Sequence, residues 1–258
     1  MHSAWLPINI MVLPICLLNL KRRRDRRERF EQQNQQPDLE FTIVEAIDGA
    51  TLDLAQLKQA GLLIGKRCED FPPGQVGCSF SHRELWQLCI RDNRPMIICE
   101  DDAVLRNDFA RAFRALFQQL PANWDFLLLG YNFDSILDVE IVPGVSFRGG
   151  FSEIQTTPIQ KDLFIQENKP VSLFNLNNAF GACTYAISPE GAKKILQLCF
   201  PLTPTIISVP ALNRNVGPSL QIDIHLNAHY RNLKAFCCIP PLAITPNDAI
   251  DSDTLNCA

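Results

Sequence analysis

The chain has 258 residues, of which 47% are hydrophobic, and a formal net charge of −4. This length and apolar content suffice to bury the core of one large domain or two small ones. The negative balance argues against a surface that attracts nucleic acid over the whole molecule. The basic residues are nevertheless unevenly placed, since Lys21–Arg29 holds seven of the 24 Lys and Arg residues.

The first apolar stretch, Trp5–Leu20, has the composition of a signal peptide or a membrane anchor. However, nothing basic precedes it, prolines and asparagines interrupt it, and it is shorter than the ~20 residues that usually span a bilayer. We therefore predict a buried first strand over Val12–Leu18. The ten cysteines form neither a C-x-x-C motif nor a Cys/His metal spacing, which favours reduced thiols and a cytoplasmic protein.

The first half of the chain alternates predicted strands with predicted helices. After the first strand, a helix is expected over Arg23–Gln33, a strand over Phe41–Ala46 and a short helix over Leu54–Ala60. A loop over Gly65–Gly77 follows. Ser81-His82-Arg83-Glu84 then fits the S-x-x-E capping box, which predicts that the next helix begins there.

Helical spacing of His82, Leu85, Trp86 and Cys89 predicts that this face of the helix packs on the core. Further strands are expected over Met96–Cys99 and Phe126–Leu129. Between them, Asn107 or Asp108 would cap a helix whose apolar residues are Phe109, Ala112, Phe113, Leu116, Phe117 and Leu120. Strands that alternate with helices are typical of βαβ units.

The second half has a different pattern. Asp134–Phe174 has no long helical period and predicts short antiparallel strands and a flexible loop. A strand is expected over Ala182–Ile187, followed by a helix to Leu198 with Ser188 as N-cap and Pro189 at its first position. Pro201–Pro218 contains four prolines and predicts a loop, and Asn232–Ile239 predicts a last strand before an extended tail. The fold class is therefore α/β, with a mixed, mainly parallel sheet flanked by helices and a small antiparallel region in the second half.

The most distinctive motif is the apolar run Met96–Cys99, which ends in Glu100, Asp101 and Asp102. Three adjacent carboxylates repel one another unless a cation or hydrogen-bond donors lie beside them. The carboxyl end of a strand is also where open α/β sheets bind ligands. Alternation along a strand would place Glu100 and Asp102 on one face and Asp101 on the other. The motif predicts a divalent metal above a phosphate-bearing substrate, and the alternative is a solvated acidic turn.

Three weaker signals remain open on the residues alone. His82 would contact a ligand or fill the core, and its helical spacing favours the core. Lys21–Arg29 would bind phosphates, contact an anionic membrane surface or form a solvated helix face, with Arg26 the best placed to bind phosphate. Asp223, a carboxylate in an apolar context, would be a general base, a helix N-cap or one half of a buried ion pair.

Taken in order, these motifs resemble glycosyltransferase family 25, the bacterial lipooligosaccharide galactosyltransferases related to the collagen galactosyltransferase domains of animals. The similar segments span nearly the whole chain: Leu18-Asn19-Leu20 with Asp25–Phe30, Ala46–Gly49, Gly74–His82, Ile98–Asp102, Ala182–Ala192, Ile222-Asp223, and Pro240–Ala243 with Ser252-Asp253. The chain departs from the family pattern at Pro201–Pro218, which looks long and proline-rich, and at Arg148–Lys169, a candidate acceptor region.

The resemblance implies a GT-A-like, Rossmann-like fold in a single domain over residues 1–258. Its nucleotide-sugar-binding half would cover about 10–130 and its acceptor side about 131–258. It also implies inverting transfer of a hexose, most often galactose, from a UDP-sugar with Mn²⁺ or Mg²⁺. The residues implied are Glu100 and Asp102 for the metal, Asp223 for catalysis, and Asn19, Arg26, Asp48, Ser81, His82 and Asp101 for the donor.

The expected partners are the UDP-sugar donor and an oligosaccharide or lipid-linked saccharide acceptor, with no nucleic acid. The expected location is the cytoplasm, with peripheral membrane contact through Lys21–Arg29. One alternative is another nucleotide-sugar-processing enzyme, although Asn19–Arg29 lacks the glycine-rich loop usual in nucleotidyltransferases. The other is a catalytically silent relative that acts as an interaction module, although such a relative would be expected to lose the acidic triplet.

Overall fold

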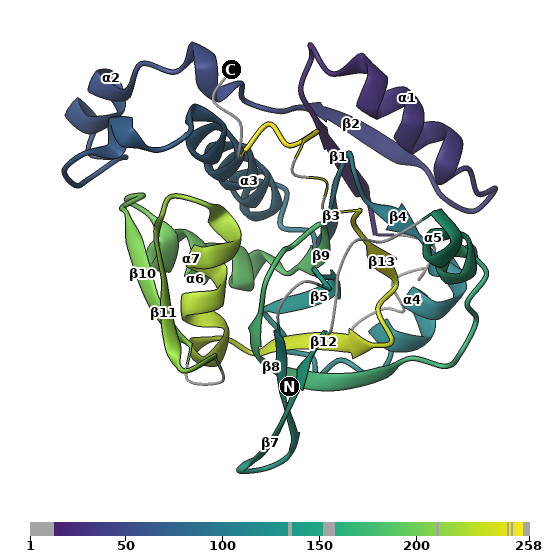
Figure 1. Ribbon diagram of the computed structural model, residues 1–258. Helices are drawn as coiled ribbons and strands as arrows, with labels where there is room; N and C mark the ends of the chain where they lie inside the picture. Colours follow the sequence, from purple (N-terminus) through teal and green to yellow (C-terminus); the bar gives the residue numbers. More distant parts are fainter. Residues whose placement is uncertain are drawn as a thin grey trace, which may run out of the picture.

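A computed structural model of the chain describes residues 13–133, 136–151, 158–209, 212–246, 248 and 250–254 (Figure 1). Its centre is a mixed sheet with the strand order β2-β1-β3-β9-β5-β12-β8-β6-β7. These strands are β1 (Ile15–Asn19), β2 (Phe41–Glu45), β3 (Met96–Glu100), β5 (Phe126–Gly130), β6 (Ile136–Val142), β7 (Val145–Gly150), β8 (Ser172–Ala179), β9 (Thr184–Ile187) and β12 (Ala235–Ile239). Two short strands, β4 (Val104–Leu105) and β13 (Ala243–Ile244), extend the sheet beside β5.

Parallel and antiparallel pairings both contribute to this sheet. The strands β2, β1 and β3 pair in parallel, and so do β5 and β12. The strand β9 lies antiparallel between β3 and β5, and β12, β8, β6 and β7 pair antiparallel in turn. The predicted mixed α/β sheet is confirmed. Antiparallel pairing, however, reaches from the second half of the chain into the centre of the sheet through β9.

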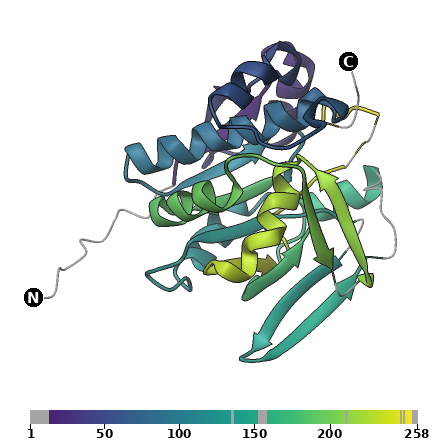
Figure 2. The ribbon, with the colours of Figure 1, turned by 90° about the vertical axis from the view of Figure 1, so that its left-hand side faces the viewer.

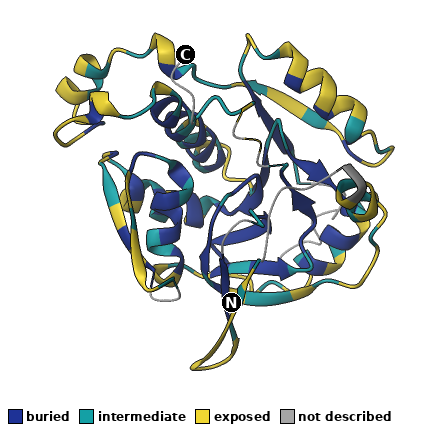
Figure 3. Cartoon of the chain, viewed as in Figure 1, coloured by how far each residue is buried: buried dark blue, intermediate teal, exposed yellow. Residues whose placement is uncertain are grey.

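Helices cover both faces of the sheet. They are α1 (Arg24–Gln33), α2 (Leu54–Gln59), α3 (Pro73–Arg91), α4 (Phe109–Phe117), α5 (Pro158–Ile165), α6 (Pro189–Cys199) and α7 (Ile222–His229), with short 3₁₀ turns η1 (Gly49–Thr51), η2 (Cys68–Asp70) and η4 (Tyr230–Asn232). The helices α3, α6 and α7 pack on one face of the sheet and share a core with alternate residues of β1, β3 and β5. The helices α1 and α4 share a second core on the opposite face. Figure 2 shows α3 and α6 lying side by side, and Figure 3 shows the inner strands and α3 buried while β7 and α2 are exposed.

Strand alternation explains the two cores. Cys16 and Leu18 of β1 face the α3 side, whereas Ile15 and Leu17 face the α1 side. Because both faces are covered, the inner strands read in the sequence as continuous apolar runs. The first strand begins at Ile15; the earlier part of the strand predicted from Val12 lies outside the described residues.

The predicted start of α3 is wrong. The helix begins at Pro73, eight residues before Ser81, with proline at its first position. Ser81 lies inside the helix, where its Oγ donates to the Gly77 carbonyl (2.7 Å) and accepts from the backbone N–H of Ile47 (2.8 Å). The hydroxyl that resembled an N-cap is instead satisfied by the preceding turn and by a distant segment.

The loop predicted over residues 201–218 is also wrong, since β10 (Thr205–Val209) and β11 (Arg214–Ser219) form an antiparallel hairpin there. Proline is tolerated because this two-stranded sheet has open edges, where a missing N–H breaks no ladder bond. The structure also adds α5 to the region where the sequence predicted only strands and a loop. The helix predicted after Ser188 is confirmed, with Ser188 Oγ accepting from the Gly191 N–H (3.0 Å). Within the described ranges no helix combines the length and the apolar content needed to cross a bilayer.

Candidate functional site

The candidate site lies where the parallel strands β1 and β3 end. Leu18 of β1 pairs in register with Glu100 of β3, so Asn19 and the acidic triplet come together at the same edge of the sheet. Glu100 is the last residue of β3, and Asp101 and Asp102 form the turn that follows. The alternation argument therefore does not apply beyond Glu100, although Glu100 and Asp102 do line the same cavities.

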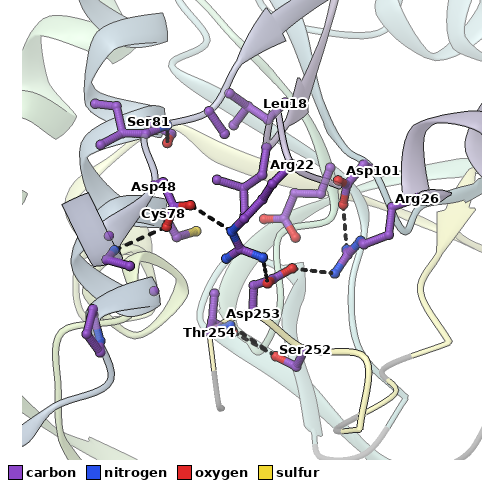
Figure 4. Close-up of a pocket in the computed structure, with 18 of the residues that line it drawn as sticks. Leu18, Arg22, Arg26, Asp48, Cys78, Ser81, Asp101, Ser252, Asp253 and Thr254 are labelled. Atoms are coloured by element: carbon purple, nitrogen blue, oxygen red, sulfur yellow. Dashed lines mark hydrogen bonds and ion pairs between the residues drawn. The ribbon is translucent and has the colours of Figure 1, made fainter. Parts of the chain in front are cut away.

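Asp101 contacts Asn19 and Arg26, two residues that were predicted to bind the sugar-nucleotide substrate. Asn19 Nδ2 donates to Asp101 Oδ2 (2.7 Å), and the buried guanidinium of Arg26 lies 2.5 Å from Asp101 Oδ1. Arg26 also lies 3.1 Å from Asp102 Oδ2. The structure thus brings Asn19, Arg26 and the triplet together, with Arg26 as counter-ion to Asp101 and Asp102. Figure 4 shows the contact between Arg26 and Asp101.

Asp102 keeps one carboxylate oxygen without a partner despite its contact with Arg26. Burial, and then the neighbouring charge of Glu100, raise the pKa of Asp102 well above its ordinary value, although Arg26 acts in the opposite direction. Its Oδ1 atom is buried without a hydrogen-bond partner. Burial likewise raises the pKa of Asp101. An orphaned carboxylate oxygen beside a second carboxylate is suited to a hard divalent cation, so Glu100 and Asp102 could hold Mn²⁺ or Mg²⁺.

A second group of potential ligands overlaps the first. Cys78 Sγ, a ring nitrogen of His82 and a carboxylate oxygen of Glu100 lie within 4.8 Å of one another. A sulfur, nitrogen and oxygen set of this kind suits Zn²⁺ better than Mn²⁺ or Mg²⁺. Burial raises the pKa of Cys78 well above the usual thiol range, so its sulfur is a neutral thiol in this environment.

Two cavities meet at Glu100 and Asp102, which together form the acidic wall of the site. The first, of about 150 Å³, lies between the end of β1, η1 and α3 and is lined by Arg22, Arg26, Asp48, Ser81 and His82. The second, of about 140 Å³, lies toward α7 and is lined by Asp223, Asn132 and Gln221. Glu100, Asp102, Cys78, Ser252 and Thr254 line both. The acids therefore stand at the junction of two binding spaces.

Asp48 and Arg22 form the outer wall of the first cavity. Arg22 Nε donates to Asp48 Oδ2 (2.7 Å), and its Nη1 donates to Asp253 Oδ1 (2.7 Å) (Figure 4). The hydrogen bond from Arg22 lowers the pKa of Asp48. Asp48 also accepts from Ala50 N–H and so caps η1. Asp48, predicted to bind the donor, thus lines the cavity, paired with an arginine that sequence reasoning did not single out.

Residues 251–253 lie against the basic segment. Arg23 pairs with both Asp251 and Asp253, and Arg29 Nη1 lies 2.9 Å from Asp251 Oδ2. The tail predicted after β12 therefore supplies part of the cavity wall. Sequence reasoning missed the roles of Asp251, Asp253 and Arg22, and the signal that pointed to them was the Ser252-Asp253 pair among the matched segments.

His82 belongs to the core and to the cavity wall at once. Its side chain is fully buried, its Nδ1 lies 2.7 Å from the Tyr185 hydroxyl, and its Nε2 lies 3.3 Å from Glu100 Oε1. Helical spacing predicted the first environment correctly. The acidic neighbour comes from β3, which no local pattern in α3 reveals.

Asp223 lies in the first turn of α7, after the N-cap residue Gln221. Its Oδ2 accepts from the Gly181 N–H (3.2 Å), and burial raises the pKa of its carboxyl. It is therefore not the N-cap that the sequence left open. The same cavity holds Asp223 and the acids at the end of β3, so the structure brings the predicted catalytic carboxylate and the predicted metal ligands together.

Comparison of the sequence with known proteins finds a matching family and several similar proteins. The family described as "Glycosyltransferase family 25 (LPS biosynthesis protein)" matches residues 12–209. The chain is 28% identical to procollagen galactosyltransferase 2 of Mus musculus over 193 residues, which cover 70% of this chain and 27% of the relative. It is 27% identical to procollagen galactosyltransferase 1-A of Xenopus laevis over 185 residues, 61% of this chain and 30% of the relative.

A third relative is of a different kind. The chain is 24% identical to the inactive glycosyltransferase 25 family member 3 of Mus musculus over 263 aligned positions, which cover 94% of this chain and 38% of the relative. The chain thus spans roughly a quarter to two fifths of the length of these three relatives.

Proposed function

The chain belongs to glycosyltransferase family 25, and we propose that it is a metal-dependent, inverting enzyme that moves a hexose, galactose in the first instance, from a UDP-sugar to a saccharide acceptor. The observation that carries the proposal is the meeting of two cavities at Glu100 and Asp102. A transferase needs a donor space and an acceptor space that share the reacting centre. Here the arginine-lined cavity suits a diphosphate, and the cavity with Asp223 suits the acceptor.

The donor would be bound by residues around the end of β1. Arg22 and Arg26 face the first cavity and present guanidinium groups, which recognise phosphate oxygens in a bidentate manner. Glu100 and Asp102 would hold Mn²⁺ or Mg²⁺, which when bound neutralises charge that develops on a diphosphate leaving group. Asp101 keeps Arg26 and Asn19 in place and so orients the phosphate side of the site.

Asp223 is the proposed general base. It lines the second cavity, which shares Glu100 and Asp102 with the proposed donor cavity. Its pKa is raised by burial, which makes its carboxylate a stronger base toward an acceptor hydroxyl near neutral pH. Proton removal there would accompany attack on the anomeric carbon from the face opposite the leaving group, which gives inversion.

For the acceptor we propose an oligosaccharide or a lipid-linked saccharide of the lipopolysaccharide type, in keeping with the description of the matching family. We also propose a cytoplasmic location. The nine cysteines in the described part of the chain are unpaired and mostly buried, as expected in a reducing compartment. Peripheral contact with an anionic membrane would use the exposed part of residues 21–29, of which Arg22, Arg23 and Arg29 are already paired with acids of the chain.

The direct test is release of UDP from UDP-galactose, UDP-glucose, UDP-GlcNAc and UDP-GalNAc, each with Mn²⁺ and with EDTA. We expect turnover of one donor that EDTA abolishes and that Asp102→Ala loses. Asp38→Ala, which removes an exposed acid far along the chain from the triplet, is the matched control and should keep full activity. Metal-independent turnover in Asp102→Ala equal to that of the unchanged protein would disprove the metal assignment.

The second candidate function is a catalytically silent interaction module. It is favoured by one observation, namely that the inactive relative aligns over 94% of this chain and the procollagen galactosyltransferase of Mus musculus over 70%. Isothermal titration with UDP and Mn²⁺ separates the two. Absence of Mn²⁺-dependent UDP binding, together with absence of UDP release from every donor, would favour the silent module.

A further inference from the structure

Three buried aromatic side chains next to Glu100 form a hydrogen-bonded network. Trp86 Nε1 donates to the Tyr185 hydroxyl (2.8 Å), and the same hydroxyl lies 2.7 Å from His82 Nδ1. Trp86, Tyr185 and His82 each have 0% of their surface exposed. Water therefore does not compete for these groups, and each hydrogen must be accommodated by the protein.

The direction of the hydrogen bonds follows from what each group can donate. An indole N–H only donates, so the Tyr185 oxygen is the acceptor for Trp86. The hydroxyl has one hydrogen of its own, and the acceptor that lies next to it is His82 Nδ1. A neutral imidazole that accepts at Nδ1 carries its hydrogen on Nε2. Trp86 and Tyr185 thus select one of the two His82 tautomers.

The selected tautomer directs an N–H toward the acidic wall. His82 Nε2 is buried, lies 3.3 Å from Glu100 Oε1 and has no hydrogen-bond partner of good geometry in the described structure. Hydrogen bonds of this kind are often long in an empty site and tighten when the site is occupied. Glu100 also lies next to Asp102, whose pKa its charge raises, so a donor beside Glu100 relieves repulsion between the two acids.

We propose that Tyr185 is a positioning residue: by donating to His82 Nδ1, it fixes the tautomer whose Nε2–H anchors one oxygen of Glu100 and leaves the other oxygen for the cation. The inference rests on the proposed function, in which Glu100 is a metal ligand. Carboxylates that bind metals are held by hydrogen bonds of this kind, and loss of such a bond typically weakens metal affinity 10- to 100-fold.

The same network argues against Zn²⁺ at Cys78, His82 and Glu100. A metal would need the lone pair of His82 Nε2, which requires the other tautomer, with hydrogen on Nδ1. The hydrogen on Nδ1 would point at the Tyr185 oxygen, which already accepts from Trp86. The hydroxyl hydrogen of Tyr185 would then lose His82 Nδ1 as its acceptor. An unsatisfied hydroxyl in a fully buried position is unfavourable, so the network favours His82 as a donor.

The first test is the tautomer of His82 in the unliganded full chain, read from ¹⁵N chemical shifts and two-bond couplings at pH 8. The chain has four histidines, and His82→Gln assigns the signal. We expect a neutral ring with hydrogen on Nε2. A neutral ring with hydrogen on Nδ1, or a doubly protonated ring, would overturn the proposal without any reference to activity.

The second test uses Tyr185→Phe, which keeps the ring stacked on Phe126 at 4.8 Å and removes only the hydroxyl. We expect the His82 signal to shift toward the Nδ1–H form and the Mn²⁺ dissociation constant, measured by the electron paramagnetic resonance signal of free Mn²⁺, to rise about tenfold. Tyr131→Phe is the matched control, since it removes a buried hydroxyl that donates to the Cys238 carbonyl (3.4 Å) away from His82. It should change neither readout.

The outcomes separate this inference from the proposed function. An unchanged tautomer and an unchanged Mn²⁺ affinity in Tyr185→Phe would refute the positioning role, as would an equal loss of affinity in Tyr131→Phe. If Tyr185→Phe does not fold, the tautomer of the unchanged protein still decides. Absence of glycosyl transfer would refute the proposed function alone, because neither the tautomer nor Mn²⁺ binding depends on turnover.

Discussion

His225, on α7 two residues after Asp223, should destabilise the fold when it is protonated. Its side chain is 2% exposed, its Nε2 is buried without a partner, and its Nδ1 lies 3.4 Å from Thr205 Oγ1. Burial lowers the pKa of His225 from 6.5 to about 4. The folded protein therefore keeps this ring neutral at pH values where the unfolded chain already binds a proton.

The sign and size of the effect follow from these two pKa values. The contribution to stability is fully present above pH 6.5 and is lost as the pH falls toward 4, because the unfolded state takes up the proton first. At pH 5 the loss is about 2 kcal/mol, and below pH 4 it approaches about 3 kcal/mol. No allowance for solvent screening is needed, since the ring is buried.

The assay is urea denaturation at pH 8 and pH 5, with and without His225→Leu. Raised carboxyl pKa values, such as that of Asp223, act in the opposite direction, so only the difference between the two proteins isolates the histidine. We expect the stability of the unchanged protein, relative to the variant, to fall by about 2 kcal/mol between the two pH values. His229→Leu serves as a comparison, since burial lowers the pKa of His229 as well but covers it less completely. The same pH dependence in the unchanged protein and in His225→Leu would refute the reasoning.

Three further predictions concern packing, charge and catalysis. Gly191→Ala should cost about 3 kcal/mol in urea denaturation, because the new Cβ would lie 2.0 Å from the carbonyl oxygen of Asp125, the residue before β5. A loss below about 1 kcal/mol would show that α6 shifts to accommodate the methyl group. Arg26→Met should lower the free energy of unfolding by about 3 kcal/mol at pH 8 and by less at pH 5, because at pH 5 the buried acids left without a counter-ion can take up protons. An equal loss of stability at both pH values would argue against the ion pairs. Asp223→Asn should lower kcat at least about 100-fold and leave the donor KM nearly unchanged in steady-state assays; an altered KM with an unchanged kcat would contradict its role as base.

Local patterns predicted those parts of the fold that local interactions determine. The alternation of strands and helices in the first half is confirmed, and so is the start of α6, where Ser188 and Pro189 supply the cap and the first turn. The position of the acidic triplet at the end of β3 followed from the apolar run that precedes it. In each case the signal lies within a few residues of the feature.

Features that depend on distant segments were missed. Ser81 carries the local signature of a helix start, yet it donates to the preceding turn and binds the backbone of Ile47, 34 residues earlier. The hairpin of β10 and β11 replaces a loop because its two strands pair with each other despite their prolines. The site shows the same limit. Sequence placed Glu100 and Asp223 on separate elements, and only the folded sheet shows that they share a cavity.

The contact between residues 251–253 and the arginines after β1 changes how the donor cavity should be understood. Counted from the sequence, residues 21–29 look like a strongly positive site for a diphosphate. In the structure Asp253 Oδ1 lies 2.7 Å from Arg22 Nη1, and Asp101 Oδ1 lies 2.5 Å from Arg26 Nη2. A diphosphate that enters the proposed donor site would therefore exchange with carboxylates instead of filling a bare positive pocket. Because carboxylates of the chain already neutralise these arginines, few counter-ions remain to be released, and donor affinity should depend on salt less steeply than the number of arginines suggests.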